Sequence, residues 1–241
     1  MAGRRTVTLH LTEGELIMKR SLALSVGVLL AVAWLLSVAA LAQGPEYTLK
    51  DYMPEAIGSS WTLSTTGAEG EEKVTYEVLP GREIDGQKAV AIVMKDAEGQ
   101  AHSGMLQAVT PDKVTTFGSL SRDRNAEASA EPSVRLYKPP AIFPGKLRAG
   151  QSAEQQVKMT RRDEEVDITL KVQLAALETV TVPKGTFADC LKLVYTTSYG
   201  ERTMTRTVWY AKGVGMVKTE QAGRSGRPAR VAQLTDYKLA K

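Results

Sequence analysis

The fold is decided by residues 207–218, which read TVWYAKGVGMVK. This pattern predicts two strands joined by a tight turn, because Gly213 stands where the turn needs a positive φ, which glycine adopts without steric cost. Gly215 falls in the second strand, where a missing side chain lets an aromatic ring lie against the backbone. Trp209 and Tyr210 are neighbours on the first strand, so we expect their side chains on opposite faces of the sheet.

Outward from this stretch, the chain has the pattern of short strands separated by turns. The clearest alternation covers residues 166–174, where aliphatic and polar residues alternate, as is typical of a strand with one buried face. Residues 180–182 resume the same phase, so a β-bulge is predicted within residues 175–179. Residues 133–137 are predicted as an edge strand that ends at the pair Pro139-Pro140.

The sequence predicts an all-β fold, because no stretch after residue 43 shows a helical stripe. We expect one large, curved antiparallel sheet of half-barrel or open-barrel form, since twist accumulates across many strands. Residues 52–118 and 143–219 share the order of their strands, acidic turns and glycine turns, although any up-and-down β chain resembles itself to some degree. Two similar meanders are therefore predicted within a single domain over residues 43–241.

The N-terminal region has the pattern of a secretory signal. A basic pair, Lys19-Arg20, precedes an apolar run over residues 22–41, and small residues lead to a predicted cleavage between Ala42 and Gln43. This pattern predicts a bacterial protein that is exported to the periplasm or beyond the cell. No cysteine stands directly after the apolar run, which excludes a lipoprotein anchor at this site.

Two further expectations concern the same region. Residues 1–17 do not fit a signal, so Met18 is the expected true start of the chain. The alternative to cleavage is an inner-membrane anchor formed by residues 22–42, because about 20 apolar residues can span a bilayer. With cleavage, we expect membrane contact to be transient.

The composition excludes several classes of function. The chain has 241 residues with a formal net charge of +4, which falls to about +2 without residues 1–42; this is too little for a nucleic-acid binder. After the signal there is one cysteine, Cys190, and one histidine, His102, so neither an internal disulfide nor a Cys/His zinc site is possible. No cofactor or metal is predicted, since no acidic run has the spacing of a calcium loop either.

Methionine and tryptophan side chains are the candidates for ligand contact. Thioethers adapt to irregular apolar guests, so a methionine-lined concave sheet is suited to an acyl chain or another amphipathic small molecule. The alternative is that these side chains simply fill the core. The candidates are Trp61, Met94, Met105, Met204, Trp209 and Met216. Arg224, Arg227 and Arg230 are suited to anionic lipid head groups or, equally, to a solvated hairpin tip.

A hydrolase would need His102 as its base. Its neighbour Ser103 is expected on the opposite face of the same strand, and Cys190 could meet His102 only through a tertiary contact. Cys190 itself is expected to be a small packed residue. A hydrolytic function is therefore kept only as a weak alternative.

Three segments together resemble a TapB-like family of exported bacterial domains of unknown function, related in shape to lipoprotein-carrier half-barrels. The segments cover residues 52–62, 180–193 and 209–218, and the last has Lys212 where the family pattern has proline. The resemblance implies a curved antiparallel sheet with a concave face in the cell envelope. It supplies no catalytic motif.

The leading hypothesis is a non-enzymatic, exported envelope protein whose curved sheet binds an apolar or amphipathic ligand. The rival hypothesis is a structural or interaction module that docks an envelope protein by its surface or by edge pairing. The two differ in whether the concave face is open to a ligand or filled by its own side chains.

Overall fold

The computed structural model describes residues 44–67, 70–122, 132–161, 164–223 and 229–240. The chain divides into two compact units, Met1–Gly44 and Pro45–Lys241, and every described strand belongs to the second. The predicted start at Met18 and the predicted cleavage between Ala42 and Gln43 lie outside the described residues, as do Arg224 and Arg227. Across the described ranges, no helix has the length and apolar character needed to cross a membrane.

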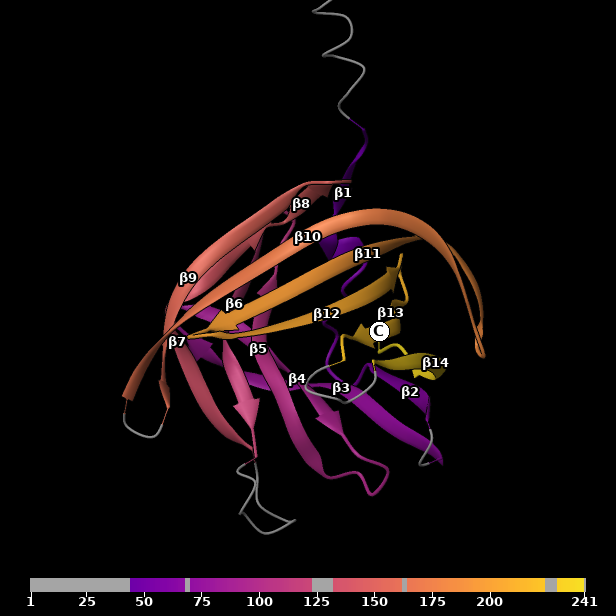
Figure 1. Cartoon of the computed structure of the whole chain (residues 1–241), viewed down its shortest axis with the longest axis horizontal. Coiled ribbons are helices and arrows are strands. Elements are labelled where there is room, and N and C mark those ends of the chain that lie inside the picture. The colour runs from indigo at the N-terminus through magenta and orange to yellow at the C-terminus, as the bar shows by residue number, and fades with distance from the viewer. Residues whose placement is uncertain (1–43, 68–69, 123–131, 162–163, 224–228, 241) are drawn as a thin grey trace, which may run out of the picture. The chain divides into compact units, whose positions relative to one another are not determined.

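Strands account for nearly all of the regular structure, and one short 3-10 helix, η1, accompanies them (Figure 1). The elements are β1 (Glu46–Thr48), η1 (Leu49–Asp51), β2 (Ser60–Gly67), β3 (Gly70–Ile84), β4 (Gln87–Lys95), β5 (Ala101–Val109), β6 (Lys113–Ser121), β7 (Ser133–Pro144), β8 (Lys146–Arg148), β9 (Ser152–Arg161), β10 (Glu164–Val182), β11 (Gly185–Tyr199), β12 (Arg202–Ala211), β13 (Gly215–Gln221) and β14 (Arg230–Lys238).

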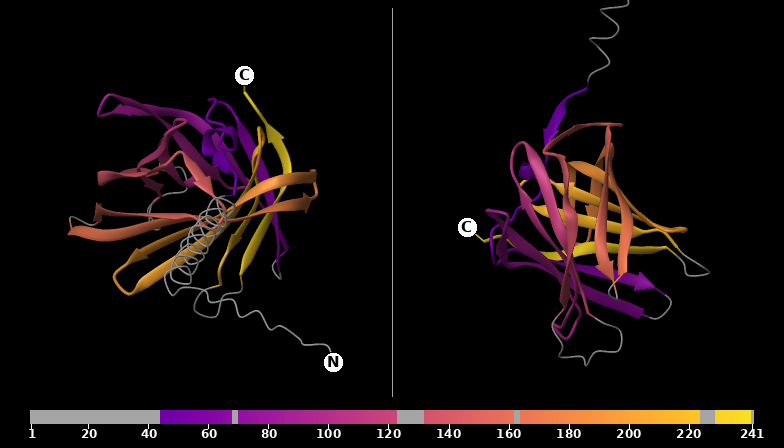
Figure 2. Two further views of the ribbon diagram at one scale, coloured as in Figure 1. Left: turned by 90° about the horizontal axis from the view of Figure 1, so that it is seen from above. Right: turned by 90° about the vertical axis from the view of Figure 1, so that its left-hand side faces the viewer.

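Twelve of these strands form one closed antiparallel barrel, which the two views of Figure 2 show from above and from the side. Its order is β10-β11-β12-β13-β14-β2-β3-β4-β5-β6-β7-β9, and β1 pairs with β8 as a separate two-stranded sheet. The prediction of an all-β, barrel-like antiparallel sheet is confirmed, and the structure adds that the sheet closes. Closure depends on β7 and β9; among the described residues, these strands pair in register at Tyr137 with Met159 and at Lys138 with Lys158. The predicted internal duplication stays a prediction.

The turn between β12 and β13 has the geometry that its glycines predict. Gly213 has a φ of +68° and lies in this turn, and Gly215 begins β13 with a φ of +102°. The indole of Trp61 lies against Gly215, because a Cβ atom there would be 2.7 Å from Trp61 Nε1. The same Nε1 donates a hydrogen bond of 2.7 Å to the carbonyl of Val214. The turn is thus held from β2, far away in sequence.

The longest hairpin joins β10 and β11 and carries the predicted bulge. The register shifts between Leu174 and Ala176 and again between Glu178 and Val180, within the predicted span. These shifts bend the hairpin over the barrel, as Figure 1 shows. At its tip, the Lys184 N–H donates to the carbonyl of Leu234 at 3.1 Å, so the tip docks on β14.

The prediction for residues 133–137 is wrong in two respects. The strand is not an edge strand, because β7 pairs with β6 on one side and with β9 on the other. The strand does not end at the two prolines, because β7 continues to Pro144. Its pairing with β6 is interrupted between Leu136 and Ala141, and both prolines fall in that interruption. Proline is tolerated there, since neither residue has to donate a hydrogen bond to the neighbouring strand.

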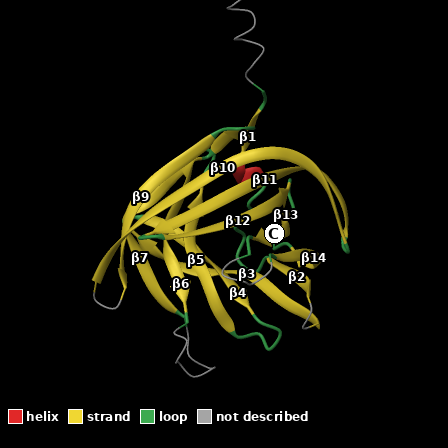
Figure 3. Cartoon of the chain, in the orientation of Figure 1, coloured by secondary structure: helices red, strands yellow, loops and turns green. Residues whose placement is uncertain are grey.

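Buried side chains form three clusters. The first joins the barrel to the cap at one of its ends, which contains η1, marked red in Figure 3, and β8. Leu49 of η1 is 2% exposed and Leu147 of β8 is 0% exposed. Both pack with Leu174 and Leu191 of the barrel. The second gathers Trp61, Val208 and Leu234 with their neighbours. The third lies on the other face of the first half of the barrel: Ala89, Ala91, Val93, Leu106 and Phe117.

Candidate ligand site on the inner face of the barrel

One face of the sheet points into the barrel. The Arg206 side chain on β12 donates from Nη2 to the Tyr76 hydroxyl on β3, at 3.0 Å. Along the sheet, β13, β14 and β2 separate these two strands, and each strand step is about 4.8 Å. Only a path across the interior of the curved sheet allows such a contact. We call the face that carries Arg206 the inner face.

The strand register extends the inner face around the barrel, because side chains alternate along a strand and directly opposed residues share a face. Val208 lies two residues after Arg206 and therefore on the same face. From Val208, directly opposed residues can be followed across β13 and β14 to β2, and then across β3 and β4 to β5. The inner face accordingly includes Val208, Thr219, Ala232, Thr65, Trp61, Tyr76, Met94 and Met105.

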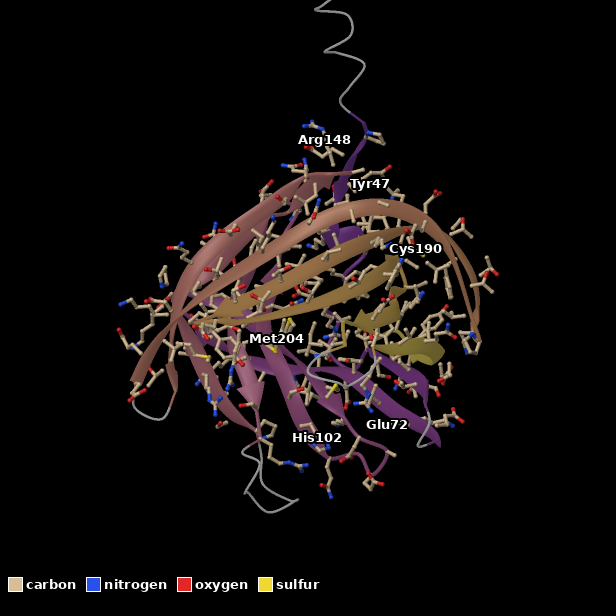
Figure 4. All side chains as sticks on the ribbon, in the orientation of Figure 1. Tyr47, Glu72, His102, Arg148, Cys190 and Met204 are labelled. Atoms are coloured by element: carbon tan, nitrogen blue, oxygen red, sulfur yellow. The ribbon has the colours of Figure 1, made fainter. Side chains whose placement is uncertain are left out.

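Five of the six predicted ligand-contacting residues lie on the inner face: Trp61, Met94, Met105, Met204 and Met216. Trp61 and Met216 are buried and Met94 is half-buried. Met105 and Met204 are each 37% exposed, so no other side chain covers them fully. Figure 4 labels Met204 on β12, below the arched β10–β11 hairpin in that view.

Trp209, the sixth predicted residue, lies on the opposite face, as its alternation with Tyr210 predicts. It is buried among charged side chains and does not face the barrel interior. Its Nε1 donates to Glu178 Oε2 at 2.7 Å, and the ammonium groups of Lys192 and Lys218 lie 5.2 and 4.5 Å from its ring centre. Hydrogen bonding to Lys192 and then to Trp209 lowers the pKa of Glu178. These contacts give Trp209 a packing role.

Arg206 is a positively charged group set among apolar side chains. It is half-buried, lies 5.3 Å from the ring centre of Tyr76, and directs Nη2 also to the Met216 sulfur at 3.6 Å. No carboxylate in the described ranges lies within 4.0 Å of its guanidinium. The charge is therefore held by an aromatic ring and a thioether without an acidic partner.

Two further tyrosines, Tyr195 and Tyr210, lie on the inner face near Arg206. Tyr195 lies directly opposite Arg206 on β11. Burial raises the pKa of Tyr195 well above its ordinary value, and burial also raises the pKa of Tyr210 although nearby Arg206 opposes the rise. Both hydroxyls are therefore neutral at physiological pH, and neither provides a negative charge for Arg206.

The sequence reasoning missed Arg206, although the sequence contains a signal for it. Residues 202–210 alternate, and Arg206 shares its phase with Met204 and Val208. A charged residue on the apolar phase of a strand is unusual and marks either an ion pair or a binding group. Selecting methionine and tryptophan by residue type alone ignores which face of the strand each residue occupies.

His102 is the second residue of β5 and lies away from the inner-face cluster. Its Nε2 is 2.6 Å from Asp96 Oδ2, and Arg122 Nη2 is 2.9 Å from its Nδ1. Because both ring nitrogens are engaged, neither is placed to accept a proton from a nucleophile. Figure 4 also shows His102 and Cys190 on opposite sides of the barrel, so the two do not form a catalytic pair.

The Cys190 thiol is fully buried and donates to the Phe187 carbonyl at 3.3 Å. Burial raises its pKa to about 11. We predict that the native protein reacts with a thiol reagent such as Ellman's reagent at least about a hundredfold more slowly than the unfolded chain, because the thiolate is both scarce and inaccessible. The rates with and without denaturant at mildly alkaline pH measure this; equal rates would contradict it.

Two other charged groups, Arg230 and Glu55, have structural partners. Arg230, one of the three arginines considered for head-group contact, is ion-paired with Glu72. Glu55 accepts a hydrogen bond of 2.8 Å from the Val109 N–H, and burial raises the pKa of this carboxyl group. Across the described ranges, no group of three or more His, Cys, Asp or Glu side chains is arranged to hold a metal ion.

Comparison with known proteins adds a family match. The family model described as DUF3108-like matches residues 56–230. A candidate lipoprotein structure from Parabacteroides distasonis is 20% identical, with 77% of this chain and 97% of the other covered and a TM-score of 0.41. A candidate exported protein with a YmcC-like fold from Bacteroides fragilis is 16% identical, with 78% and 98% covered and a TM-score of 0.42. No curated protein sequence matches the chain.

Proposed function

Since this chain belongs to the DUF3108-like family, whose match covers the barrel from β2 to β13, we propose a function that resides in the barrel itself. We infer that the protein is exported to the cell envelope and binds an apolar or amphipathic ligand, such as a lipid, on its inner face without catalysing a reaction. The signal pattern of residues 18–42 supports export. The resemblance to TapB-like exported domains that we expect from the sequence favours the same location.

The exposure of Met105 and Met204 carries the proposal. Both belong to the inner face, which elsewhere buries large apolar side chains, yet each is 37% exposed. Apolar surface left open on a concave face is a common mark of a ligand site, and single exposed residues on an outer surface are not. Flexible thioethers also suit an alkyl chain of variable length.

The test is mass spectrometry of organic extracts from the protein, produced with its own N-terminal segment and purified from the envelope fraction under mild conditions. We expect an amphiphile near one molecule per chain, absent after denaturation and refolding. The double variant Met105→Glu/Met204→Glu should lose bound amphiphile by about tenfold or more, because two carboxylates would oppose an alkyl chain.

The matched control places the same charges on the outer face. Val134→Glu/Ile142→Glu changes two exposed residues of β7 that lie on the other side of the sheet, so it should retain the amphiphile. An empty wild-type protein would contradict ligand binding. That result would favour the rival function, an interaction module of the envelope, which cross-linking in intact cells then tests.

A further inference from the structure

We propose that Arg206 is the anion-binding residue of this barrel, and that the ligand is an amphipathic anion, an alkyl chain with one acidic head group. The inference rests on the proposed function and names the chemical class of its ligand. Arg206 would bind the head group while Met204 and Met105 contact the chain. Three features of the inner face support this assignment.

The first feature is the missing negative charge. A half-buried charge is normally paired, because removing it from water without a partner is unfavourable. Arg206 has no carboxylate partner among the described residues, and its tyrosine neighbours are neutral. An anionic ligand would supply the missing partner.

The second feature is the orientation of the guanidinium. Both hydrogen bonds from Arg206 to described residues use Nη2, one to the Tyr76 hydroxyl and one to the Met216 sulfur. The N–H groups of Nη1 and Nε have no acceptor among those residues. A guanidinium can offer two parallel N–H groups to a carboxylate or phosphate, and Tyr76 would hold it in position for that contact. We regard Tyr76 as a positioning residue.

The third feature is the neighbourhood of the charge. Met204 precedes Arg206 by two residues on the same face, about 7 Å along the strand, and is exposed. Arg202 and Arg135 also lie on the inner face, and neither has a carboxylate within 4.0 Å in the part of the chain that the structure describes. A positive potential beside exposed apolar surface favours an amphipathic anion over a free inorganic one.

The proposal predicts how binding responds to loss of the Arg206 charge. We would titrate the full chain calorimetrically with three probes, decanoate, 1-decanol and inorganic phosphate. Wild-type protein should prefer decanoate. Arg206→Gln should weaken decanoate binding about 10- to 100-fold and leave 1-decanol within about twofold, because one charge-assisted contact is lost. Arg206→Lys should keep part of the preference for decanoate over 1-decanol, since lysine keeps the positive charge but lacks the two parallel N–H groups of a guanidinium.

A matched control removes a charge elsewhere. Lys171→Gln changes an exposed residue on the opposite face of β10, so decanoate affinity should stay within about twofold. Thermal unfolding of every variant shows whether it is folded. Tyr76→Phe offers a second route, because it removes the hydroxyl that positions Arg206 and should lower decanoate affinity without changing the net charge.

The outcomes separate this inference from the proposed function. If the folded Arg206→Gln variant binds decanoate as tightly as wild type does, Arg206 is not the anion-binding residue. The same holds if the variant loses affinity for decanoate and for 1-decanol to the same extent. If phosphate binds as tightly as decanoate, the ligand class is wrong and the site takes a free oxyanion. If 1-decanol binds while decanoate does not, the inner face takes neutral ligands. If no probe binds to wild-type protein, the proposed function fails together with this inference.

Discussion

Replacement of Gly215 by alanine is expected to lower the free energy of unfolding by about 3–5 kcal/mol. The added Cβ would lie 2.7 Å from Trp61 Nε1 and 2.8 Å from both Cε2 and Cζ2, closer than non-bonded atoms can approach. The indole cannot move aside freely, because it is buried and its Nε1 donates to the Val214 carbonyl. The φ of +102° adds strain for any residue with a side chain.

Gly213→Ala is the matched control, because it alters the same turn without a clash. Its φ of +68° costs an alanine about 1–2 kcal/mol. Apart from the two neighbours in the chain, no described residue has an atom within 4 Å of the added Cβ. Urea unfolding of both variants gives the comparison. In a Trp61→Ala background, Gly215→Ala should cost clearly less, since the ring that it would clash with is gone. Equal costs for the two glycine variants would contradict the proposed contact.

This turn shows how far local sequence determines the fold. Gly213 and Gly215 fix the backbone of a short segment, and the period of two over residues 166–174 fixes which side of a strand is buried. The bulge within residues 175–179 follows from the same period, because the phase resumes after it. Each of these predictions needed only neighbours in the chain, and each is confirmed.

Contacts between distant segments could not be predicted in the same way. Closure of the barrel depends on a short register between β7 and β9, and nothing in the composition of either strand specifies its partner. The prolines of β7 indicated an end to the strand, whereas the pairing interruption that accommodates them is set by the neighbouring strand. Periodicity predicts faces and bends but does not predict which edges meet.

In the candidate site, too, local alternation was predictable and contacts between distant strands were not. Strand phase correctly separates Trp209 from Tyr210, and it also groups Arg206 with Met204 and Val208. Arg206 on β12 contacts Tyr76 on β3, 130 positions away in the chain. The curvature of the sheet across β13, β14 and β2 brings these two residues together. The methionines could be selected by residue type. The charge of Arg206 becomes informative only when the side chains around it are known.

The cap at one end of the barrel, which contains η1 and β8, is expected to contribute a large share of the stability of the barrel. Leu49→Ala should lower the free energy of unfolding by about 2–5 kcal/mol, because Leu49 is 2% exposed and would leave a cavity against Leu147 and Leu191. Urea unfolding followed by tryptophan fluorescence measures the loss. Trp61 and Trp209 report from the barrel wall, so their response shows whether the cap and the barrel unfold together.

Ile57→Ala is the control within the same segment, since Ile57 is 55% exposed and should change stability by no more than about 0.5 kcal/mol. A Leu49 variant as stable as the Ile57 variant would mean that the cap does not belong to the cooperative core. We expect the opposite, because backbone hydrogen bonds tie the cap to the barrel on two sides. The Leu49 N–H donates to the Gly145 carbonyl, and the Asp51 carbonyl accepts from the Gly213 N–H, both at 2.8 Å. Loss of the cap should therefore also loosen the turn that Trp61 holds.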